Sequence, residues 1–187
     1  MNPARRLTPA QENSLAIAAA VVTANAYYIH PIIALVADHF GVSHARIGLV
    51  PALNQLALAV GIFLLLPLGD RYSNRRLTIL FASGQTVSLA LMTLASGFGA
   101  FVLGSTLLGF FTIAPYLLPA YASKRVAPER LGQVTAKLTA GVILGILVAR
   151  VGAGVIAEHF GWRAVYWLAT GLMVAVTLGL PWLMEGG

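Results

Sequence analysis

The sequence contains no cysteine, and it is poor in charged side chains. The lack of cysteine excludes disulfide bonds and thiolate metal sites. Only 10% of the 187 residues are charged, with 12 Lys and Arg against 6 Asp and Glu, whereas about 25% is usual in soluble domains. Hydrophobic residues make up 58%. Since so few charges cannot keep the surface of a soluble domain wet, most of the outer surface is expected to face lipid.

Six apolar segments are each long enough to cross a bilayer as a helix, which requires about 20 apolar residues. They are residues 14–37, 47–69, 77–96, 98–122, 134–157 and 162–183. These segments are too long, and alternate too little, to be the strands of a transmembrane barrel. The sequence therefore predicts an all-α membrane protein with a six-helix transmembrane domain over residues 14–184 and short tails at 1–13 and 185–187.

The basic residues gather in the loops on one side of this predicted domain. That side holds Arg5, Arg6, Arg71, Arg75, Arg76, Lys124, Arg125, Arg130 and Lys137. The other side holds Arg46 and Arg163. Because Lys and Arg accumulate on the cytoplasmic side, both termini are predicted to be cytoplasmic. The same distribution accounts for the net charge of +6, so no nucleic-acid partner is expected.

Two short turns on the predicted outer side resemble each other. Residues 38–41 read Asp-His-Phe-Gly, and residues 158–161 read Glu-His-Phe-Gly. The pair is either a trace of internal duplication or two helix ends terminated by glycine, with an aromatic anchor for the next helix. The second interpretation is favoured, because so few residues carry the repeat.

A charged loop lies between the second and third predicted helices. Residues 66–77 read Leu-Pro-Leu-Gly-Asp-Arg-Tyr-Ser-Asn-Arg-Arg-Leu. This loop resembles the signature loop of the major facilitator superfamily, with Asp70 at the acidic position and Leu66 and Ser73 where glycine is usual. The resemblance implies a latch that holds the cytoplasmic side together through charge-assisted hydrogen bonds. Its candidate residues are Asp70, Arg71, Arg75 and Arg76. Alternatively, the arginines only enforce topology.

A second resemblance lies in the first predicted helix. Residues 25–31 read Asn-Ala-Tyr-Tyr-Ile-His-Pro, similar to the Asn-x-Tyr-Tyr-x-Gln-Pro segment of a bacterial efflux branch of the same superfamily. The Gly161-Trp162-Arg163 entry into the sixth helix is also typical of that branch. The resemblance implies a small-molecule transporter in the bacterial inner membrane, and it covers the first six of the twelve helices that such transporters have.

Polar groups within predicted spans are candidates for function, because they are costly in lipid. Asn25, Tyr28, His30 and Arg150 are therefore the predicted substrate-binding residues. His30 is the candidate for proton coupling, although a lone histidine also suits a hydrogen bond between helices. Arg150 either faces a cavity, where it would bind an anionic or polar group, or extends toward water at the outer end. The cavity is favoured, and Pro31 is expected to bend the helix.

The fifth predicted helix carries a stripe of small residues suited to close helix packing. The stripe consists of Gly141, Gly145, Ala149 and Gly152. No cluster of metal ligands lies at depth, so no metal or cofactor is expected, and the serine turn of an intramembrane protease is missing its leading glycine. An enzyme is therefore not expected, whereas a non-transporting membrane scaffold remains an alternative.

Six helices are half of the expected twelve, because such transporters place their substrate site between two six-helix halves. The chain is thus expected to pair with a second copy as a parallel homodimer, or else to be the amino-terminal half of a longer protein. In the homodimer, Asp70 of one copy should lie near residues 133–137 of the other.

Overall fold

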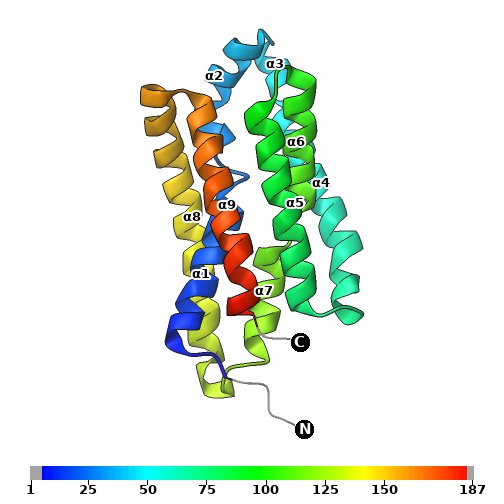
Figure 1. The fold of residues 1–187 in the computed structure, drawn as a ribbon, viewed down its shortest axis with the longest axis vertical. Coiled ribbons are helices and arrows are strands. Elements are labelled where there is room, and N and C mark those ends of the chain that lie inside the picture. The colour runs from blue at the N-terminus through cyan, green and yellow to red at the C-terminus, as the bar shows by residue number, and fades with distance from the viewer. Residues whose placement is uncertain (1–5, 185–187) are drawn as a thin grey trace.

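The computed structural model describes residues 6–184 of the chain, and every regular element within them is helical (Figure 1). The elements are α1 (Pro9–Ala24), α2 (Ile29–Phe40), α3 (His44–Ile47), α4 (Leu49–Leu65), η1 (Leu66–Asp70), α5 (Asn74–Leu94), α6 (Phe98–Phe110), α7 (Ala114–Ser123), η2 (Pro128–Arg130), α8 (Leu131–Phe160) and α9 (Trp162–Leu183). Of the tails predicted at 1–13 and 185–187, residues 1–5 and 185–187 lie outside the described residues, whereas residues 9–13 form the beginning of α1.

Among the described residues, six stretches are long and apolar enough to cross a membrane, which confirms the predicted six-helix membrane fold. They are Pro9–Phe40, His44–Asp70, Asn74–Leu94, Phe98–Ser123, Pro128–Phe160 and Trp162–Leu183. Each overlaps one of the predicted segments. We call the end of the bundle where α1 begins and α9 finishes the terminal end, and the opposite end the far end (Figure 1).

The helices pack mainly in three pairs, α1 along α8, α4 along α6 and α5 along α9. Glycine allows two of these pairs, α1 with α8 and α4 with α6, to approach closely. A Cβ atom on Gly145 would lie 2.5 Å from the Ala20 carbonyl oxygen of α1, and one on Gly141 would lie 2.6 Å from that of Ala16. Ala149 is also buried, whereas a Cβ on Gly152 would meet nothing within 4 Å. The small-residue stripe thus lies against α1 along part of its length.

Two of the six spans are interrupted within the bundle. The first breaks between α1 and α2 at residues 25–28, and the fourth breaks between α6 and α7 at residues 111–113. A proline follows each break, Pro31 within α2 and Pro115 within α7. Proline cannot donate the hydrogen bond to the residue four positions earlier, and its ring crowds that carbonyl, so each break lies where the sequence weakens the helix.

Two arginines form hydrogen bonds between the antiparallel helices α5 and α9, one at each end of the pair. At the far end, Arg163 of α9 donates to the carbonyl oxygens of Thr93 (2.6 Å) and Ala95 (2.9 Å), where α5 ends. At the terminal end, Arg75 of α5 donates to the carbonyl oxygen of Pro181 in α9 (3.2 Å). The last carbonyls of a helix lack partners within it and attract cations. Arg75, expected in the latch, thus already binds within its own chain.

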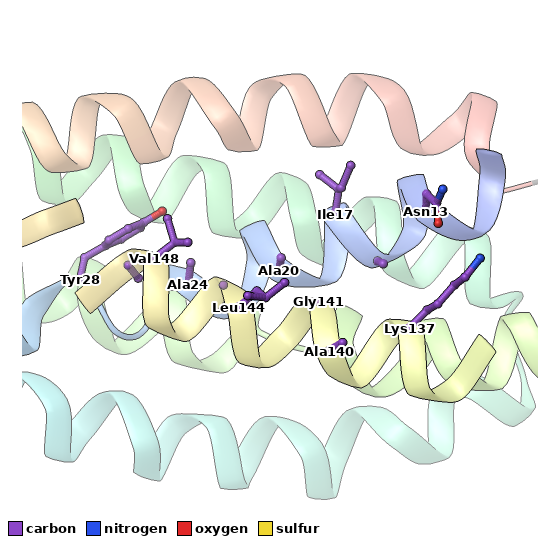
Figure 2. Close-up of a pocket in the computed structure, with 13 residues that line it drawn as sticks. Asn13, Ile17, Ala20, Ala24, Tyr28, Lys137, Ala140, Gly141, Leu144 and Val148 are labelled. Carbon is purple, nitrogen blue, oxygen red and sulfur yellow. The ribbon is translucent and has the colours of Figure 1, made fainter. Parts of the chain in front are cut away.

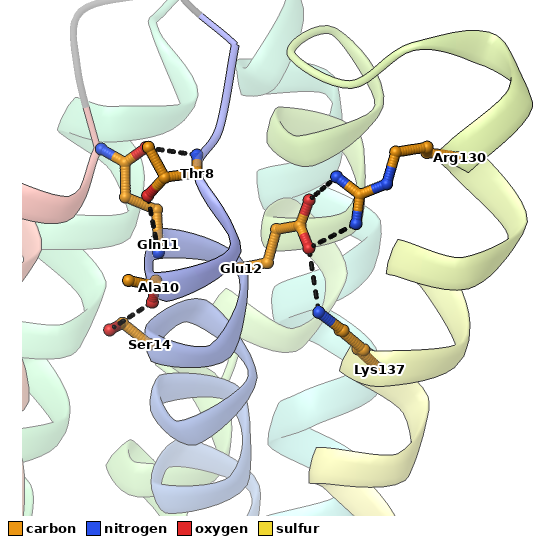
Figure 3. A network of polar contacts seen from close by, with 7 residues as sticks. All are labelled: Thr8, Ala10, Gln11, Glu12, Ser14, Arg130 and Lys137. Carbon is orange, nitrogen blue, oxygen red and sulfur yellow. Dashed lines mark hydrogen bonds and ion pairs between the residues drawn. The ribbon is translucent and has the colours of Figure 1, made fainter.

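A buried ion network joins α1 to α8 at the terminal end (Figure 3). The Glu12 side chain has no exposed surface. Its carboxylate accepts two hydrogen bonds from Arg130, at 2.7 and 3.1 Å, and a third from Lys137 at 3.0 Å. Such charge-assisted bonds, one pair of them bidentate, are the strong class of hydrogen bond.

Candidate functional site

A cavity of about 260 Å³ lies between α1, α4, α7 and α8, beside both helix interruptions. We call it the Tyr27 cavity. Its polar lining side chains are Thr23, Tyr27, Gln55, Thr112, Tyr116 and Thr139. The α4 and α8 helices, which both contribute to its lining, lie on opposite sides of the bundle (Figure 1). Its walls therefore offer hydroxyl and amide groups for hydrogen bonding in an otherwise apolar bundle.

A cluster of Tyr27, His30 and Arg150 lies at this cavity. The Arg150 guanidinium carbon is 5.7 Å from the centre of the Tyr27 ring, and the His30 and Tyr27 ring centres are also 5.7 Å apart. Arg150 follows Ile146, a lining residue, by four positions on α8 and so shares its helix face. Both His30 and Arg150 are exposed in the isolated chain. The geometry thus brings together two of the four predicted substrate-binding residues.

A hydrogen-bonded network behind the cavity connects the two interrupted spans through α5. The amide of Gln85 donates to the Thr112 hydroxyl at 2.6 Å, and the Asn25 amide lies 3.5 Å from the Gln85 oxygen. All three side chains are buried. The Asn25 Oδ1 and Thr23 Oγ1 atoms are buried with no hydrogen-bond partner among the described residues. Buried polar atoms of this kind are unusual, and they lie where the first span is interrupted.

The other two predicted substrate-binding residues, Asn25 and Tyr28, point away from this cluster. Asn25 faces α5, as described, and the Tyr28 ring packs edge-on against Tyr166 of α9, with centres 6.4 Å apart. Asn25 and Tyr28 are three positions apart and share one side of the chain, whereas His30, two positions after Tyr28, points in roughly the opposite direction. Tyr27, not Tyr28, therefore lines the cavity.

The predicted latch residues lie on the terminal end between α4 and α5. Asp70, Arg71 and Arg76 are exposed, and no ion pair joins them to any residue in the range 6–184. Arg75 is partly buried and donates to Pro181, as described above. Three of the four side chains are thus available for contact with a second unit.

The described residues contain no group of three or more His, Asp or Glu side chains that could hold a metal ion. The lining groups of the Tyr27 cavity are neutral, and His30 and Arg150 both lie beside its lining residue Tyr27. Such a site can bind and orient a polar or anionic molecule.

Sequence reasoning missed several polar residues of this region, namely Glu12, Tyr27, Gln55, Gln85 and Thr112. Gln55, Gln85 and Thr112 carried a usable signal, because a polar side chain inside an apolar span requires a partner or a function. Glu12 lies just before the predicted first span and gave no such signal.

Comparison with known proteins places these features in a family. The family model described as Major Facilitator Superfamily matches residues 15–186. Uncharacterized transporter YgaY of Escherichia coli O157:H7 is 34% identical over 182 residues, which cover 95% of this chain and 45% of that protein. Probable transporter SCO4007 of Streptomyces coelicolor is 29% identical over 166 residues, covering 89% and 38% respectively. The chain therefore spans less than half the length of these relatives.

A solved structure shares the fold. The crystal structure of the POT family transporter PepTSo matches 97% of this chain and 39% of its own chain, with a TM-score of 0.76 and 14% sequence identity. At this identity the match concerns the arrangement of helices alone.

Proposed function

The chain belongs to the Major Facilitator Superfamily, and from this premise we propose that it forms one six-helix half of a secondary transporter that moves a small molecule by alternating access. The Tyr27 cavity is the observation that supports this most, because polar groups from four spans meet there beside two helix interruptions. Secondary transporters bind substrate near the bilayer midplane, often at discontinuous helices between two repeats. We further propose that the membrane is the bacterial inner membrane and that the terminal end is cytoplasmic.

The second half would cover the face between α4 and α8. Large apolar side chains are exposed on both helices, including Phe63 at 80% and Ile143 at 53%. In the proposed parallel homodimer, the same face of two copies would meet across a twofold axis. A second six-helix half of different sequence is the alternative, and the roughly doubled length of the relatives favours it.

The oligomeric mass in detergent distinguishes these two assemblies, and crosslinking tests the latch. Since the chain has no cysteine, Asp70→Cys with Gln133→Cys would introduce the only thiols. If the homodimer forms, this pair should give a disulfide-linked dimer. The control pair, Asp70→Cys with Leu178→Cys, should give none, because Leu178 is exposed on α9, away from the proposed contact. A monomeric mass with no crosslink would eliminate the homodimer.

An anionic substrate is proposed from the charges at the cavity. With His30 protonated, two cations would lie beside the Tyr27 ring. A bound anion would offset both charges, so that proton binding and anion binding favour each other, as linkage requires. His30 would then couple transport to protons, and Arg150 would hold the anion. Roles for Asn25 and Tyr28 remain predictions, and they would act from behind the cavity.

Transport is tested in proteoliposomes by the uptake of a panel of radiolabelled organic anions under an imposed pH gradient. Arg150→Gln is expected to abolish uptake, and His30→Gln to remove its acceleration by the gradient. Leu178→Ala, on the outside of α9, serves as the control with unchanged uptake. Uptake that is unaffected by either cavity substitution would refute the proposed site.

Access of water to the cavity separates a transporter from a scaffold. We expect a membrane-impermeant maleimide to label Thr139→Cys in the cavity wall and to leave Leu178→Cys, on the lipid-facing side, unlabelled. Absence of labelling at Thr139→Cys from both sides of the membrane would favour a scaffold.

A further inference from the structure

A second, larger cavity of about 500 Å³ follows the opposite side of the α1–α8 pair (Figure 2). We call it the α1–α8 groove. Its α8 wall includes Leu144 and Val148, whereas the Tyr27 cavity is lined by Val142 and Ile146. Positions two apart on a helix point in roughly opposite directions. The groove is thus separate from the Tyr27 cavity, with which it shares no lining residue. Two of its residues have other predicted functional roles, since Tyr28 is a predicted substrate-binding residue and Lys137 lies in the segment that the homodimer would bring near Asp70.

The groove is elongated along the membrane normal. On the first span its lining runs from Asn13 of α1 to Tyr28, just before α2, and on α8 from Lys137 to Ala149. At 1.5 Å per residue the α8 side spans about 18 Å, more than the roughly 15 Å that one leaflet contributes to a hydrocarbon core of about 30 Å. Its middle is lined by small or aliphatic side chains. These dimensions match a lipid chain that enters from the terminal end.

The polar end of the groove carries a positive charge. Lys137 and Asn13 both lie at that end, and Tyr28 lies at the other (Figure 2). Lys137 and Arg130 share the single carboxylate of Glu12, so the network has a net charge of +1. The Lys137 side chain remains 38% exposed. Since its ammonium has three N–H donors and Glu12 receives one, it can also donate to an anionic headgroup.

We propose that the α1–α8 groove binds an anionic phospholipid of the leaflet at the terminal end. One acyl chain occupies the groove, and the headgroup phosphate accepts hydrogen bonds from Lys137 and Asn13. Charge complementarity selects this occupant over a neutral lipid, because basic pockets between transmembrane helices attract anionic headgroups. Apolar burial of the chain holds it against α8.

Native mass spectrometry of the delipidated protein tests this site with phosphatidylglycerol and phosphatidylcholine of identical acyl chains. One lysine near the membrane surface contributes about 1 kcal/mol toward an anionic lipid, so the wild type should bind phosphatidylglycerol about fivefold more tightly. Lys137→Gln should bring that ratio close to one. Lys124→Gln, which alters an exposed lysine after α7, should leave it unchanged.

Two further variants separate a lipid contact from a structural role for Lys137. Glu12→Gln releases Lys137 and raises the net charge of the network, so it should maintain or increase the preference for phosphatidylglycerol even if the protein is less stable. Ala140→Phe, in the groove wall, should reduce binding of both lipids, whereas Val87→Phe, at an exposed position on α5, should not.

Three results would overturn the proposal. The first is equal binding of the two lipids by the wild type. The second is undiminished binding by Ala140→Phe. The third is efficient self-crosslinking of Ile17→Cys, which lines the groove, because a second copy of the chain would then occupy the site.

Discussion

Replacement of Glu12 by glutamine should destabilise the bundle by a predictable amount. The substitution keeps the size of the side chain and removes its charge, so three charge-assisted hydrogen bonds become neutral or are lost. A hydrogen bond to a charged group contributes about 1.5–3 kcal/mol, against about 0.5–1.5 kcal/mol for a neutral one. The difference is about 1 kcal/mol for each bond. It must be reduced because Arg130 and Lys137 are 40% and 38% exposed and can turn to water.

The net loss expected for Glu12→Gln is therefore about 2 kcal/mol, which lowers the midpoint of thermal unfolding by about 4–8 °C in a domain of this size. Circular dichroism at 222 nm in detergent measures this midpoint. Glu129→Gln is the matched control, since Glu129 is exposed and has no ion pair in the described part of the chain. If both substitutions lower the midpoint equally, or neither does, the buried network does not stabilise the fold as argued.

Three further substitutions test the packing and polar contacts. Gly145→Leu should lower the free energy of unfolding by about 3 kcal/mol, because its Cβ would meet the backbone of α1. Gly152→Leu is the control and should be nearly neutral. Equal unfolding midpoints for the two variants would contradict this. Gln85→Leu should lower the free energy of unfolding by about 1 kcal/mol, since it removes the 2.6 Å hydrogen bond to Thr112. An unfolding midpoint at or above that of the wild type would argue against a stabilising role for this network. Arg163→Gln should speed amide hydrogen exchange at the end of α5 and leave its middle unchanged, and uniform protection would show that this arginine is dispensable.

The fold was largely predictable because it follows from segment length and hydrophobicity, which tertiary contacts do not alter. The two acid-His-Phe-Gly turns show that a short local pattern also predicted where helices end. Gly41 and Gly161, the last residues of these turns, have φ values of 65° and 90° and are the only described residues with positive φ. Glycine adopts such angles without steric cost, so a glycine after an apolar run was a sound signal for a helix end.

The candidate site was only partly predictable, because local helix geometry does not show which neighbour each face of a helix meets. Adjacent residues on a helix point about 100° apart, so Tyr27 and Tyr28 had to meet different surroundings. Packing of the helices decides that Tyr27 lines the cavity while Tyr28 contacts Tyr166 of α9. Arg75 illustrates the same limit, since its bond to Pro181 joins residues 106 positions apart. Contacts of that range are set by packing, which no local pattern specifies.

The polar side chains of this chain divide into two groups, and the division points to a second unit. Glu12, Gln85 and Arg163 bind partners within the bundle. His30 and Arg150 remain exposed at the Tyr27 cavity, at a depth where exposure to lipid would be costly. A membrane protein avoids that cost by covering such groups with protein or by lining a water-filled cavity with them. Coverage of His30 and Arg150 is therefore a second reason, beside the exposed apolar side chains, to propose a second six-helix unit on the face between α4 and α8.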